Sequence, residues 1–398
     1  MGRKAPLFGL YHGGLVQTCV MEKEEMKRPL KVLHLITGLS SGGVENMLYK
    51  VVTRYDRERF NPVVCCIKSG GAVAESLKAE GIGVIMMNRM RGHGFDWRAV
   101  LEIQRMLKQV SVDVLRTHQY HANLYGRIAG RLAGVPVIIP SFHNLYRSPD
   151  KPKMHRRLIN RFLASWSDRL VAVSDAVADD IVRYDGIRRE RIRVIHNGIV
   201  IEDFRPSIKK AKAREVFGLP EKRWIVGSVG RLTPQKGHEF MIKAVKGLKE
   251  VALAIAGDGP LRRRLKEVAH KEGVECYLLG TLDQKKIPLF LKALDIFCFP
   301  SLWEGMPSAL LEAMASGLPV IATRISSNME IVGNAGILVD TGAPEEIRDS
   351  IERLMGSEEM RKNYAEQASK KAERFSIENT VREYENLYLE VLKEKGLQ

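Results

Sequence analysis

The sequence contains little cysteine and no long apolar run. Five cysteines occur in 398 residues, and no two of them form a C-x-x-C pair. We therefore expect neither a disulfide framework nor a structural zinc site, and a reducing cytosol fits best. No apolar run reaches the roughly 18 residues that a membrane-spanning helix needs. Residues 7–20 are superficially like a secretion signal, but polar residues interrupt them and no small-residue cleavage site follows.

The composition also excludes several classes of protein. Hydrophobic residues make up 45% of the chain and charged residues 28%, with 34 glycines and 16 prolines. These values are ordinary for a globular protein, so collagen-like, coiled-coil and largely disordered chains are excluded. The length allows about two or three domains.

The positive charge lies mainly in the first half of the chain. The formal net charge is +16, and residues 1–199 carry 32 Lys and Arg against 18 Asp and Glu. The rest of the chain is nearly balanced, with 31 against 29. Such asymmetry favours an anionic partner for the first half, namely an acidic membrane surface, a phosphorylated substrate or nucleic acid. A solvated basic surface explains the counts equally well.

Short apolar runs alternate with amphipathic helical patterns along the whole chain. The runs are residues 32–36, 63–67, 84–87, 112–115, 137–139 and 170–173, followed by 224–229, 253–256, 276–279, 296–299 and 320–322. Continuous apolar strands joined by helices are typical of parallel sheets that are covered on both faces. The sequence therefore predicts an α/β protein with two doubly wound, Rossmann-like domains.

The domain boundaries follow from turn residues and charge. We expect an N-terminal extension over 1–28, a first domain over 29–199 that binds the acceptor, and a second over 200–375 that binds a nucleotide sugar. A turn at 197–198 and a proline at 206 mark the hinge. Residues 376–398 form a final helix with an apolar stripe, which we expect to pack back on the first domain.

The stretch 299–320 combines a strand end, a loop and an apolar helix. The strand ends at Pro300, Glu304 lies in the loop, and the helix contains Glu312 among apolar neighbours. Ligands of open parallel sheets bind beyond the carboxyl ends of the strands. A carboxylate on an apolar helix is costly unless it is paired or faces a polar ligand. Glu312 could instead cap a neighbouring group or reach solvent.

Two cations follow another strand, and two glycines follow the first one. Arg231 and Lys236 come after residues 224–229, close to the start of a helix expected over 238–248. A guanidinium and an ammonium there can bind a diphosphate without a metal, although they could also be solvated surface cations. Gly42 and Gly43 open a helix and allow close backbone approach to an anion or a sugar, or simply make a tight turn.

These motifs together resemble retaining, nucleotide-sugar-dependent glycosyltransferases of glycosyltransferase family 4, which have the GT-B fold. Residues 299–320 are similar to the family's E-x7-E element with its E-A-M-A-x-G-x-P-V tail, and 230–237 to its G-R-L-x-x-x-K-G element. The resemblance extends from about residue 30 over nearly the whole chain. It implies two Rossmann-like domains that face each other across a cleft, and transfer that retains the anomeric configuration.

The resemblance also assigns roles to residues. It implies that Glu304 contacts the donor sugar, that Glu312 holds the ribose hydroxyls, and that Arg231 and Lys236 bind the phosphates and stabilise the leaving group. The remaining donor-binding positions that it implies are Gly42, Gly43, Gly305, Met306, Pro307 and Ser308.

Histidines supply the other candidates for the site. His118 follows the strand 112–115, where a side chain can project into the cleft, and the resemblance assigns it the catalytic loop position. His121, His143 and His196 are weaker candidates, and each could be a histidine that only orients a loop. No set of histidines and carboxylates has metal-ligand spacing, so we expect no protein-bound metal.

A basic and aromatic segment lies in the first half. Its cations surround apolar residues, as in a helix that rests on an anionic membrane, although the same apolar face could pack on the core. The cations are Arg147, Lys151, Lys153, Arg156, Arg157 and Arg161, and the apolar residues are Leu158, Ile159, Phe162, Leu163 and Trp166. No stacking platform or recognition module accompanies the charge, so no nucleic-acid partner is expected.

The sequence thus predicts a glycosyltransferase with a nucleoside-diphosphate sugar as donor, no other cofactor, and a carbohydrate or lipid-linked acceptor. Synthesis of a cell-surface polysaccharide, lipopolysaccharide or glycolipid is the expected setting, in the cytoplasm or on the inner face of the cell membrane. Two alternatives stay open. One is a nucleotide-sugar epimerase or phosphorylase on the same scaffold, and the other is a non-catalytic protein that binds nucleotide sugars.

Overall fold

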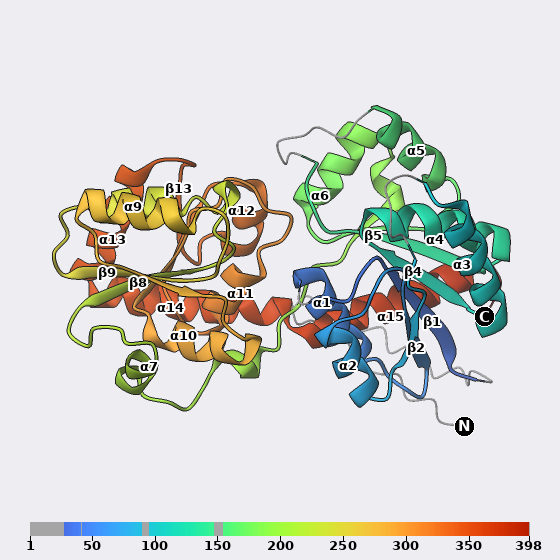
Figure 1. Cartoon of the computed structure of the whole chain (residues 1–398), viewed down its shortest axis with the longest axis horizontal. Helices are drawn as coiled ribbons and strands as arrows, with labels where there is room; N and C mark the ends of the chain where they lie inside the picture. Colours follow the sequence, from blue (N-terminus) through green and yellow to red (C-terminus); the bar gives the residue numbers. More distant parts are fainter. Residues whose placement is uncertain (1–27, 41, 90–94, 147–153, 398) are drawn as a thin grey trace, which may run out of the picture.

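The computed structural model describes residues 28–40, 42–89, 95–146 and 154–397, which form two lobes side by side (Figure 1). Most of the predicted N-terminal extension lies outside these residues, as do Arg147, Lys151 and Lys153 of the predicted basic segment. No helix within the described part of the chain is both long enough and apolar enough to span a bilayer.

Seven strands form the sheet of the first lobe, which we call the N-lobe, in the order β3-β2-β1-β4-β5-β6-β7. Every neighbouring pair is parallel. The strands are β1 (Leu30–Ile36), β2 (Phe60–Cys66), β3 (Gly83–Met86), β4 (Val114–His118), β5 (Val137–Phe142), β6 (Leu170–Ala172) and β7 (Ile192–Val194).

Six strands form the sheet of the second lobe, the C-lobe, in the order β10-β9-β8-β11-β12-β13. These pairs are parallel as well. The strands are β8 (Trp224–Val229), β9 (Val251–Ala256), β10 (Cys276–Gly280), β11 (Ile296–Phe299), β12 (Val320–Thr323) and β13 (Ile337–Val339). The sheets confirm the predicted doubly wound architecture. The apolar runs missed two three-residue strands, β7 and β13.

Helices cover both faces of each sheet, because the strands are apolar on both sides. The N-lobe carries α1 (Gly43–Val52), α2 (Ala72–Ala79), α3 (Trp97–Val110), α4 (Tyr120–Ala133), α5 (Met154–Ala164) and α6 (Asp175–Asp180). The C-lobe carries α7 (Lys210–Val216), α8 (His238–Ala244), α9 (Arg262–Glu272), α10 (Ile287–Ala293), α11 (Ser308–Ala315), α12 (Ser326–Val332), α13 (Pro344–Gly356) and α14 (Glu358–Ala372). Helix α8 ends four residues before the predicted 248.

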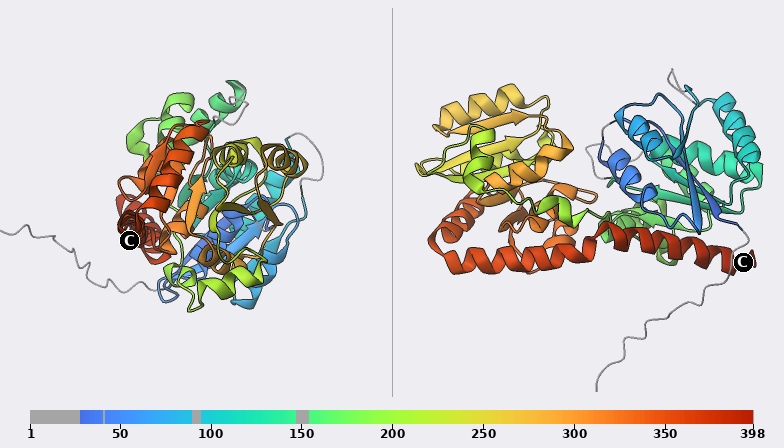
Figure 2. Two further views of the ribbon diagram at one scale, coloured as in Figure 1. Left: turned by 90° about the vertical axis from the view of Figure 1, so that its left-hand side faces the viewer. Right: turned by 90° about the horizontal axis from the view of Figure 1, so that it is seen from below.

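The last helix, α15 (Ile377–Glu394), leaves the C-lobe and packs on the N-lobe. Figure 2 shows α14 and α15 running one after the other beneath both lobes. Tyr384, Leu387 and Tyr388 of α15 belong to the same buried cluster as Val32 of β1 and Val51 of α1. Where the chain crosses back, the Ile199 N–H donates to the Phe375 carbonyl and the Ile377 N–H donates to the Ile199 carbonyl, so the two connections between the lobes run side by side.

Candidate active site between the lobes

The candidate site lies at the carboxyl ends of β8 and β11, near the middle of the C-lobe sheet. In both sheets the strand order reverses direction there, at β1/β4 and β8/β11, which is where open α/β sheets bind their ligands. Arg231 and Lys236 follow β8, and the loop with Glu304 follows β11.

Lys236 and Glu304 form an ion pair in the interior of this site. Lys236 Nζ lies 2.7 Å from Glu304 Oε1 and 4.9 Å from the centre of the Phe299 ring. Gly237 has a φ of +63°, and a Cβ there would lie 2.1 Å from the Pro300 carbonyl oxygen. Only glycine fits this close approach, which holds the cation-bearing turn against the loop.

Arg231 is exposed at the same edge of the sheet. Its side chain makes no ion pair or hydrogen bond with any residue that the structure describes. The two expected cations therefore differ in this structure, since only one of them has an ionic partner. Lys236 is neutralised by Glu304, and the Arg231 guanidinium is free to bind an anion.

Glu312 is buried in α11, with 6% of its surface exposed. Its carboxylate accepts a hydrogen bond from Gln284 at 3.3 Å. Burial raises the pKa of Glu312, and the charge of Lys50 on α1 acts in the opposite direction. A buried carboxylate with one long hydrogen bond has unused acceptor capacity, which suits the hydroxyl groups of a ligand.

On the N-lobe side, Gly42 and Gly43 begin helix α1. A Cβ at Gly42 would lie 2.2 Å from Glu45 Oε2, whereas a Cβ at Gly43 would meet no atom within 4 Å. Glu45 is itself held by Gln119, which donates to Oε1 at 2.9 Å. Gly43 thus leaves open space at the N-terminus of α1.

The structure corrects the expected placement of His118. Strand β4 runs to His118 instead of ending at residue 115, and the imidazole is buried with 3% of the residue exposed. Its Nε2 lies 3.1 Å from His34 Nδ1, and its Nδ1 lies 3.3 Å from His143 Nε2. His118 therefore occupies the interior of the N-lobe and does not project freely into a cleft.

The loop after β11 touches the N-lobe directly. A Cβ at Gly305 would lie 2.2 Å from the His143 carbonyl oxygen, and Ser174 Oγ donates to the Gly305 carbonyl at 2.6 Å. The Asn197 N–H donates to Met306 Sδ at 3.1 Å. Pro307 and Ser308 then begin α11 as its N-cap and first residue.

A second contact between the lobes involves His196, which follows β7. His196 Nε2 and the backbone N–H of Asp175 both bond the carboxylate of Glu330 on α12. Burial alone would lower the pKa of His196, but the hydrogen bond and charge of Glu330 outweigh it and raise the pKa above its ordinary value. His121, by contrast, has a pKa lowered by partial burial and makes ring contacts within the N-lobe.

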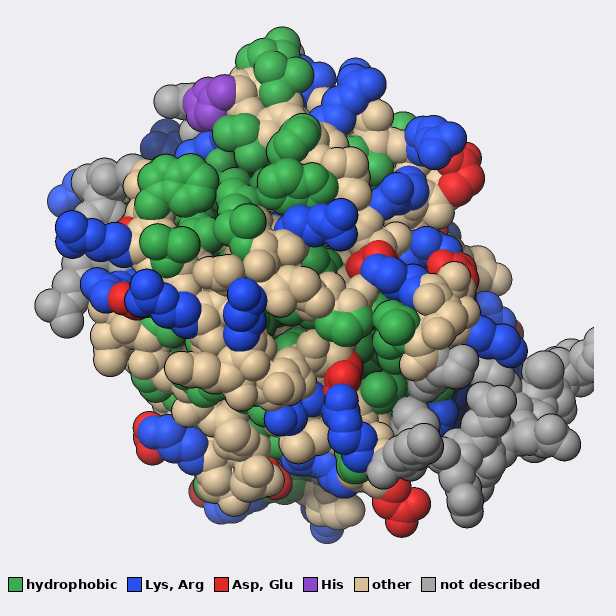
Figure 3. Space-filling model, turned by 90° about the vertical axis from the view of Figure 1, so that its right-hand side faces the viewer, with side chains coloured by type: hydrophobic (Ala, Val, Ile, Leu, Met, Phe, Trp, Pro, Cys, Tyr) green, Lys and Arg blue, Asp and Glu red, His purple; other side chains and the backbone are tan. Residues whose placement is uncertain are grey.

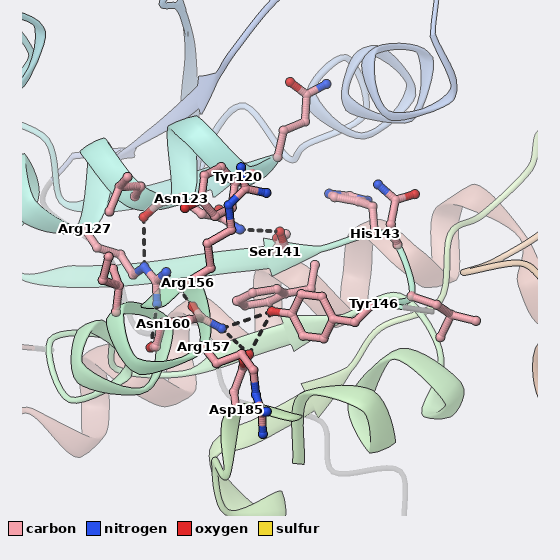
Figure 4. Close-up of a pocket in the computed structure, with 16 residues that line it drawn as sticks. Tyr120, Asn123, Arg127, Ser141, His143, Tyr146, Arg156, Arg157, Asn160 and Asp185 are labelled. Carbon is pink, nitrogen blue, oxygen red and sulfur yellow. Dashed lines mark hydrogen bonds between the residues drawn. The ribbon is translucent and has the colours of Figure 1, made fainter. Parts of the chain in front are cut away.

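Next to His143, the N-lobe contains a cavity of about 220 Å³ between α4, β5, α5 and the turn after α6. Figure 4 shows polar side chains from these separate segments pointing toward one another around it. Asp185 accepts from the Tyr146 hydroxyl at 2.8 Å and from Asn160. Arg156 lies over the Tyr120 ring and has no carboxylate partner within the described part of the chain. Sequence reasoning missed this cavity.

An apolar surface adjoins the cavity. On α5, Met154, Leu158 and Phe162 are 62%, 59% and 59% exposed, and they follow one another at intervals of four residues. Figure 3 shows exposed apolar side chains gathered on this face of the N-lobe with Lys and Arg side chains beside them. Leu163, which the sequence placed on the same apolar face as Leu158 and Phe162, is buried, so α5 uses one face for the core and another for this surface.

Ring contacts extend this surface beyond α5. Tyr120 contacts His121, His121 contacts Tyr125, Tyr125 contacts Phe95, and Phe95 contacts Trp97. We call the exposed residues Phe95, Trp97, Tyr120, Met154, Leu158, Ile159 and Phe162 the apolar surface. No acidic residue lies in α5, whereas Arg156, Arg157 and Arg161 do.

Two family models match the chain, one for each lobe. Residues 41–203 match the Glycosyltransferase Family 4 model, and residues 209–371 match the Glycosyl transferases group 1 model. The two lobes have the two-sheet architecture of GT-B glycosyltransferases. The chain therefore belongs to this family of glycosyltransferases, as the sequence motifs predicted.

Individual relatives and solved structures match over most of its length. The chain is 28% identical over 382 residues to the Escherichia coli UDP-Gal:alpha-D-GlcNAc-diphosphoundecaprenol alpha-1,3-galactosyltransferase, covering 92% of this chain and 98% of the relative. It is 28% identical to a D-inositol 3-phosphate glycosyltransferase of Corynebacterium urealyticum, over 72% of this chain and 74% of the relative. The crystal structure of the Anabaena protein HepE in complex with UDP superposes with a TM-score of 0.81 at 23% identity, covering 90% of this chain and 99% of HepE.

Proposed function

We propose that this glycosyltransferase moves a sugar from a nucleoside-diphosphate sugar in the C-lobe to a hydroxyl group of a lipid-linked glycosyl acceptor in the N-lobe cavity. The contact between Gly305 and His143 carries the proposal. Gly305 follows Glu304 in the donor loop, and His143 lines the cavity. Two candidate substrate sites therefore adjoin at one point, as a direct transfer requires.

The donor half of the proposal rests on charge. Arg231 and Lys236 would bind the diphosphate, and Glu312 would accept hydrogen bonds from the ribose hydroxyls. Glu304 would contact the sugar when Lys236 turns to the phosphates. The open space at Gly43 lets the donor approach the N-terminus of α1. Two cations at the leaving group would stabilise its developing charge, so the reaction is proposed to need no metal.

The proposed chemistry is substitution on one face of the sugar. The bond between the anomeric carbon and the β-phosphate oxygen breaks, and the acceptor oxygen bonds to that carbon on the same face. The acceptor proton passes to an oxygen of the leaving phosphate. The product then retains the anomeric configuration of the donor, and an NMR spectrum showing the inverted linkage would overturn this step.

The acceptor half rests on the cavity and the apolar surface. The E. coli relative acts, by its name, on a sugar carried by a polyprenyl diphosphate. A similar acceptor fits here, because Arg156 beside the cavity can bind a phosphate and the exposed apolar residues of α5 can enter a membrane. We infer that the enzyme works at the inner face of the cell membrane, in synthesis of a surface glycan.

The test has two stages. First, the melting temperature is measured with UDP, GDP and ADP, since a bound ligand stabilises the folded state. The nucleotide that raises the melting temperature identifies the base of the donor. Second, matching nucleotide sugars are incubated with and without N-acetylglucosaminyl-diphosphoprenol in detergent. Sugar transfer only when the acceptor is present supports the proposal. A converted donor sugar without acceptor would show an epimerase instead, and no effect of any nucleotide would overturn the donor site.

A further inference from the structure

A row of buried polar side chains connects helix α15 with the interior of the N-lobe. It begins at Arg116 of β4, which is buried and donates from Nη1 to the Tyr388 hydroxyl at 3.2 Å. The hydroxyl groups of Tyr388 and Tyr55 are 2.7 Å apart, and the Tyr55 hydroxyl lies 3.2 Å from His34 Nε2. Residues far apart in the sequence, from β1, β4, α15 and the turn after α1, thus share one hydrogen-bonded path.

The path continues through three imidazoles to the surface where the lobes meet. His34 Nδ1 is 3.1 Å from His118 Nε2, and the two rings are stacked. His118 Nδ1 is 3.3 Å from His143 Nε2. The last nitrogen, His143 Nδ1, is buried and has no partner among the residues that the structure describes. The carbonyl of the same residue is the group that Gly305 of the C-lobe approaches.

Arg116 sets the direction, from donor to acceptor, of the hydrogen bonds along the row. A guanidinium can only donate, so the Tyr388 oxygen accepts from Arg116 and the Tyr388 proton is directed to Tyr55. Tyr55 then donates to His34 Nε2, which leaves the proton of His34 on Nδ1. A neutral imidazole has one donor nitrogen and one acceptor nitrogen, so each ring that accepts at Nε2 donates at Nδ1 to the next ring.

The opposite direction leaves two polar groups unpaired, one more than the forward direction. It would leave the buried Tyr388 proton beside the Arg116 cation with no acceptor in the described structure, and it would leave His143 Nδ1 as an unpaired acceptor. The forward direction leaves only one group unpaired, the Nδ1–H of His143. Unpaired polar groups in a low-dielectric interior are costly, so the forward direction is preferred.

The three rings stay neutral at physiological pH. Burial, followed by the charge of Arg116, lowers the pKa of His143 to about 3 and the pKa of His34 and His118 well below the ordinary value. Neutral rings must choose between Nδ1–H and Nε2–H, and each choice depends on the neighbouring partner.

We propose that this row fixes His143 as a hydrogen-bond donor through Nδ1 at the contact between the lobes, and that Tyr388 and His118 are positioning residues for it. A substrate oxygen next to the Glu304 loop would supply the missing acceptor. Only this last statement rests on the proposed function. In this arrangement a residue of α15 sets the tautomer of a histidine whose carbonyl contacts the loop that carries Glu304.

Imidazole nitrogen spectra of the full-length protein, labelled with ¹⁵N-histidine at neutral pH, test the row without any activity measurement. We expect His34, His118 and His143, assigned by single substitutions, to be Nδ1–H tautomers. Tyr388→Phe removes the hydroxyl link, so the Nδ1–H state should be partly lost in all three. Tyr384→Phe is the matched control, because Tyr384 stacks on Arg116 at 3.6 Å through its ring. Nε2–H tautomers in the wild type would overturn the row.

Turnover tests its role in catalysis. Tyr388→Phe should lower kcat about tenfold, the effect of one misplaced hydrogen-bond donor, with the KM for the donor within about twofold. Tyr384→Phe should change neither. Equal losses in both variants would show a packing effect and overturn the catalytic role. If Tyr388→Phe does not fold, Tyr55→Phe breaks the same row and replaces it. A wild type without transfer activity would count against the proposed function, while the spectra still decide the row.

Discussion

Lys236 Nζ and Glu304 Oε1 lie 2.7 Å apart, so the two residues that the motifs assign to different parts of the donor bind each other. The pair is largely buried, which makes each charge the main partner of the other. If Lys236 binds the donor diphosphate as proposed, the diphosphate has to take the ammonium from Glu304. The freed carboxylate is then available to a sugar hydroxyl, so binding of the two parts of the donor is coupled.

Loss of either cation should be severe. We expect Lys236→Ala and Arg231→Ala each to lower kcat/KM by more than about 100-fold, because each removes charge that stabilises the leaving diphosphate. Initial rates at varied donor concentration measure the effect. Arg263→Ala is the control, since Arg263 is an exposed cation of the same lobe paired within α9. A near-normal rate in either variant would show that the substituted cation does not stabilise the leaving diphosphate.

Glu312→Gln should separate binding from stability. Burial raises the pKa of Glu312 above 4.5, so the folded protein binds more protons than the unfolded chain there and loses stability as pH rises through that raised pKa. At pH 7 the neutral amide should therefore raise the free energy of unfolding by about 1 kcal/mol, and with it the melting temperature. The gain should shrink toward acid pH.

The same variant should bind the donor poorly. An amide cannot accept from both ribose hydroxyls as a carboxylate can, so we expect the donor KM to rise about tenfold or more with a smaller change in kcat. Calorimetric melting and steady-state kinetics measure the two effects on one preparation. A variant that is both less stable and kinetically normal would contradict this account of Glu312.

The contact between His196 and Glu330 should make lobe closure depend on pH. The pKa of His196 lies above 6.5, so its contribution to the closed arrangement is complete below that pH and is lost as pH rises through the raised pKa. Glu330, Glu383 and Asp175 are the charges that act on it. X-ray scattering should show a larger radius of gyration at alkaline pH.

Glu330→Gln should abolish this pH dependence, because the histidine loses its ionic partner. Glu352→Gln should leave it unchanged, since Glu352 pairs with Arg348 inside the C-lobe. A wild-type radius that does not vary with pH, or a dependence that survives in Glu330→Gln, would show that another group controls the lobes.

The apolar surface should bind anionic membranes. We expect the chain to sediment with vesicles that contain phosphatidylglycerol and much less with phosphatidylcholine alone, and added salt should weaken the binding. Replacing Leu158 and Phe162 together with Glu should reduce the bound fraction about tenfold, because two apolar groups no longer enter the interface. Val216→Glu is the control, since Val216 is exposed on the C-lobe. Equal binding of both variants would show that α5 is not the membrane-binding element.

The sequence was sufficient to predict the fold and the family. Apolar runs of strand length located eleven of the thirteen strands that the structure describes, and β8 and β11 are among them. Strand ends then indicated Arg231, Lys236 and Glu304, because side chains at the carboxyl end of a parallel sheet gather at one edge. These inferences need only local patterns, which a single sequence contains.

The other features depend on distances that periodicity does not report. The cavity is lined by Asn123, Tyr146, Asn160 and Asp185, which come from separate segments. His118 was misplaced because its strand continues three residues beyond the last apolar residue of the predicted run, into polar sequence. Extended backbone alternates its side chains, so the length of the strand decides which side of the sheet a residue occupies.

Helix α15 has a consequence for how the protein is made. Its residues Ile377, Val381, Leu387 and Leu392 complete the core of the lobe that contains β1, although they are synthesised after the whole C-lobe. While the ribosome is still translating the C-lobe, the first lobe has an uncovered apolar face. The core of the N-lobe therefore cannot be completed during synthesis until α15 has been translated, and a nascent chain released before that point would expose this face to aggregation.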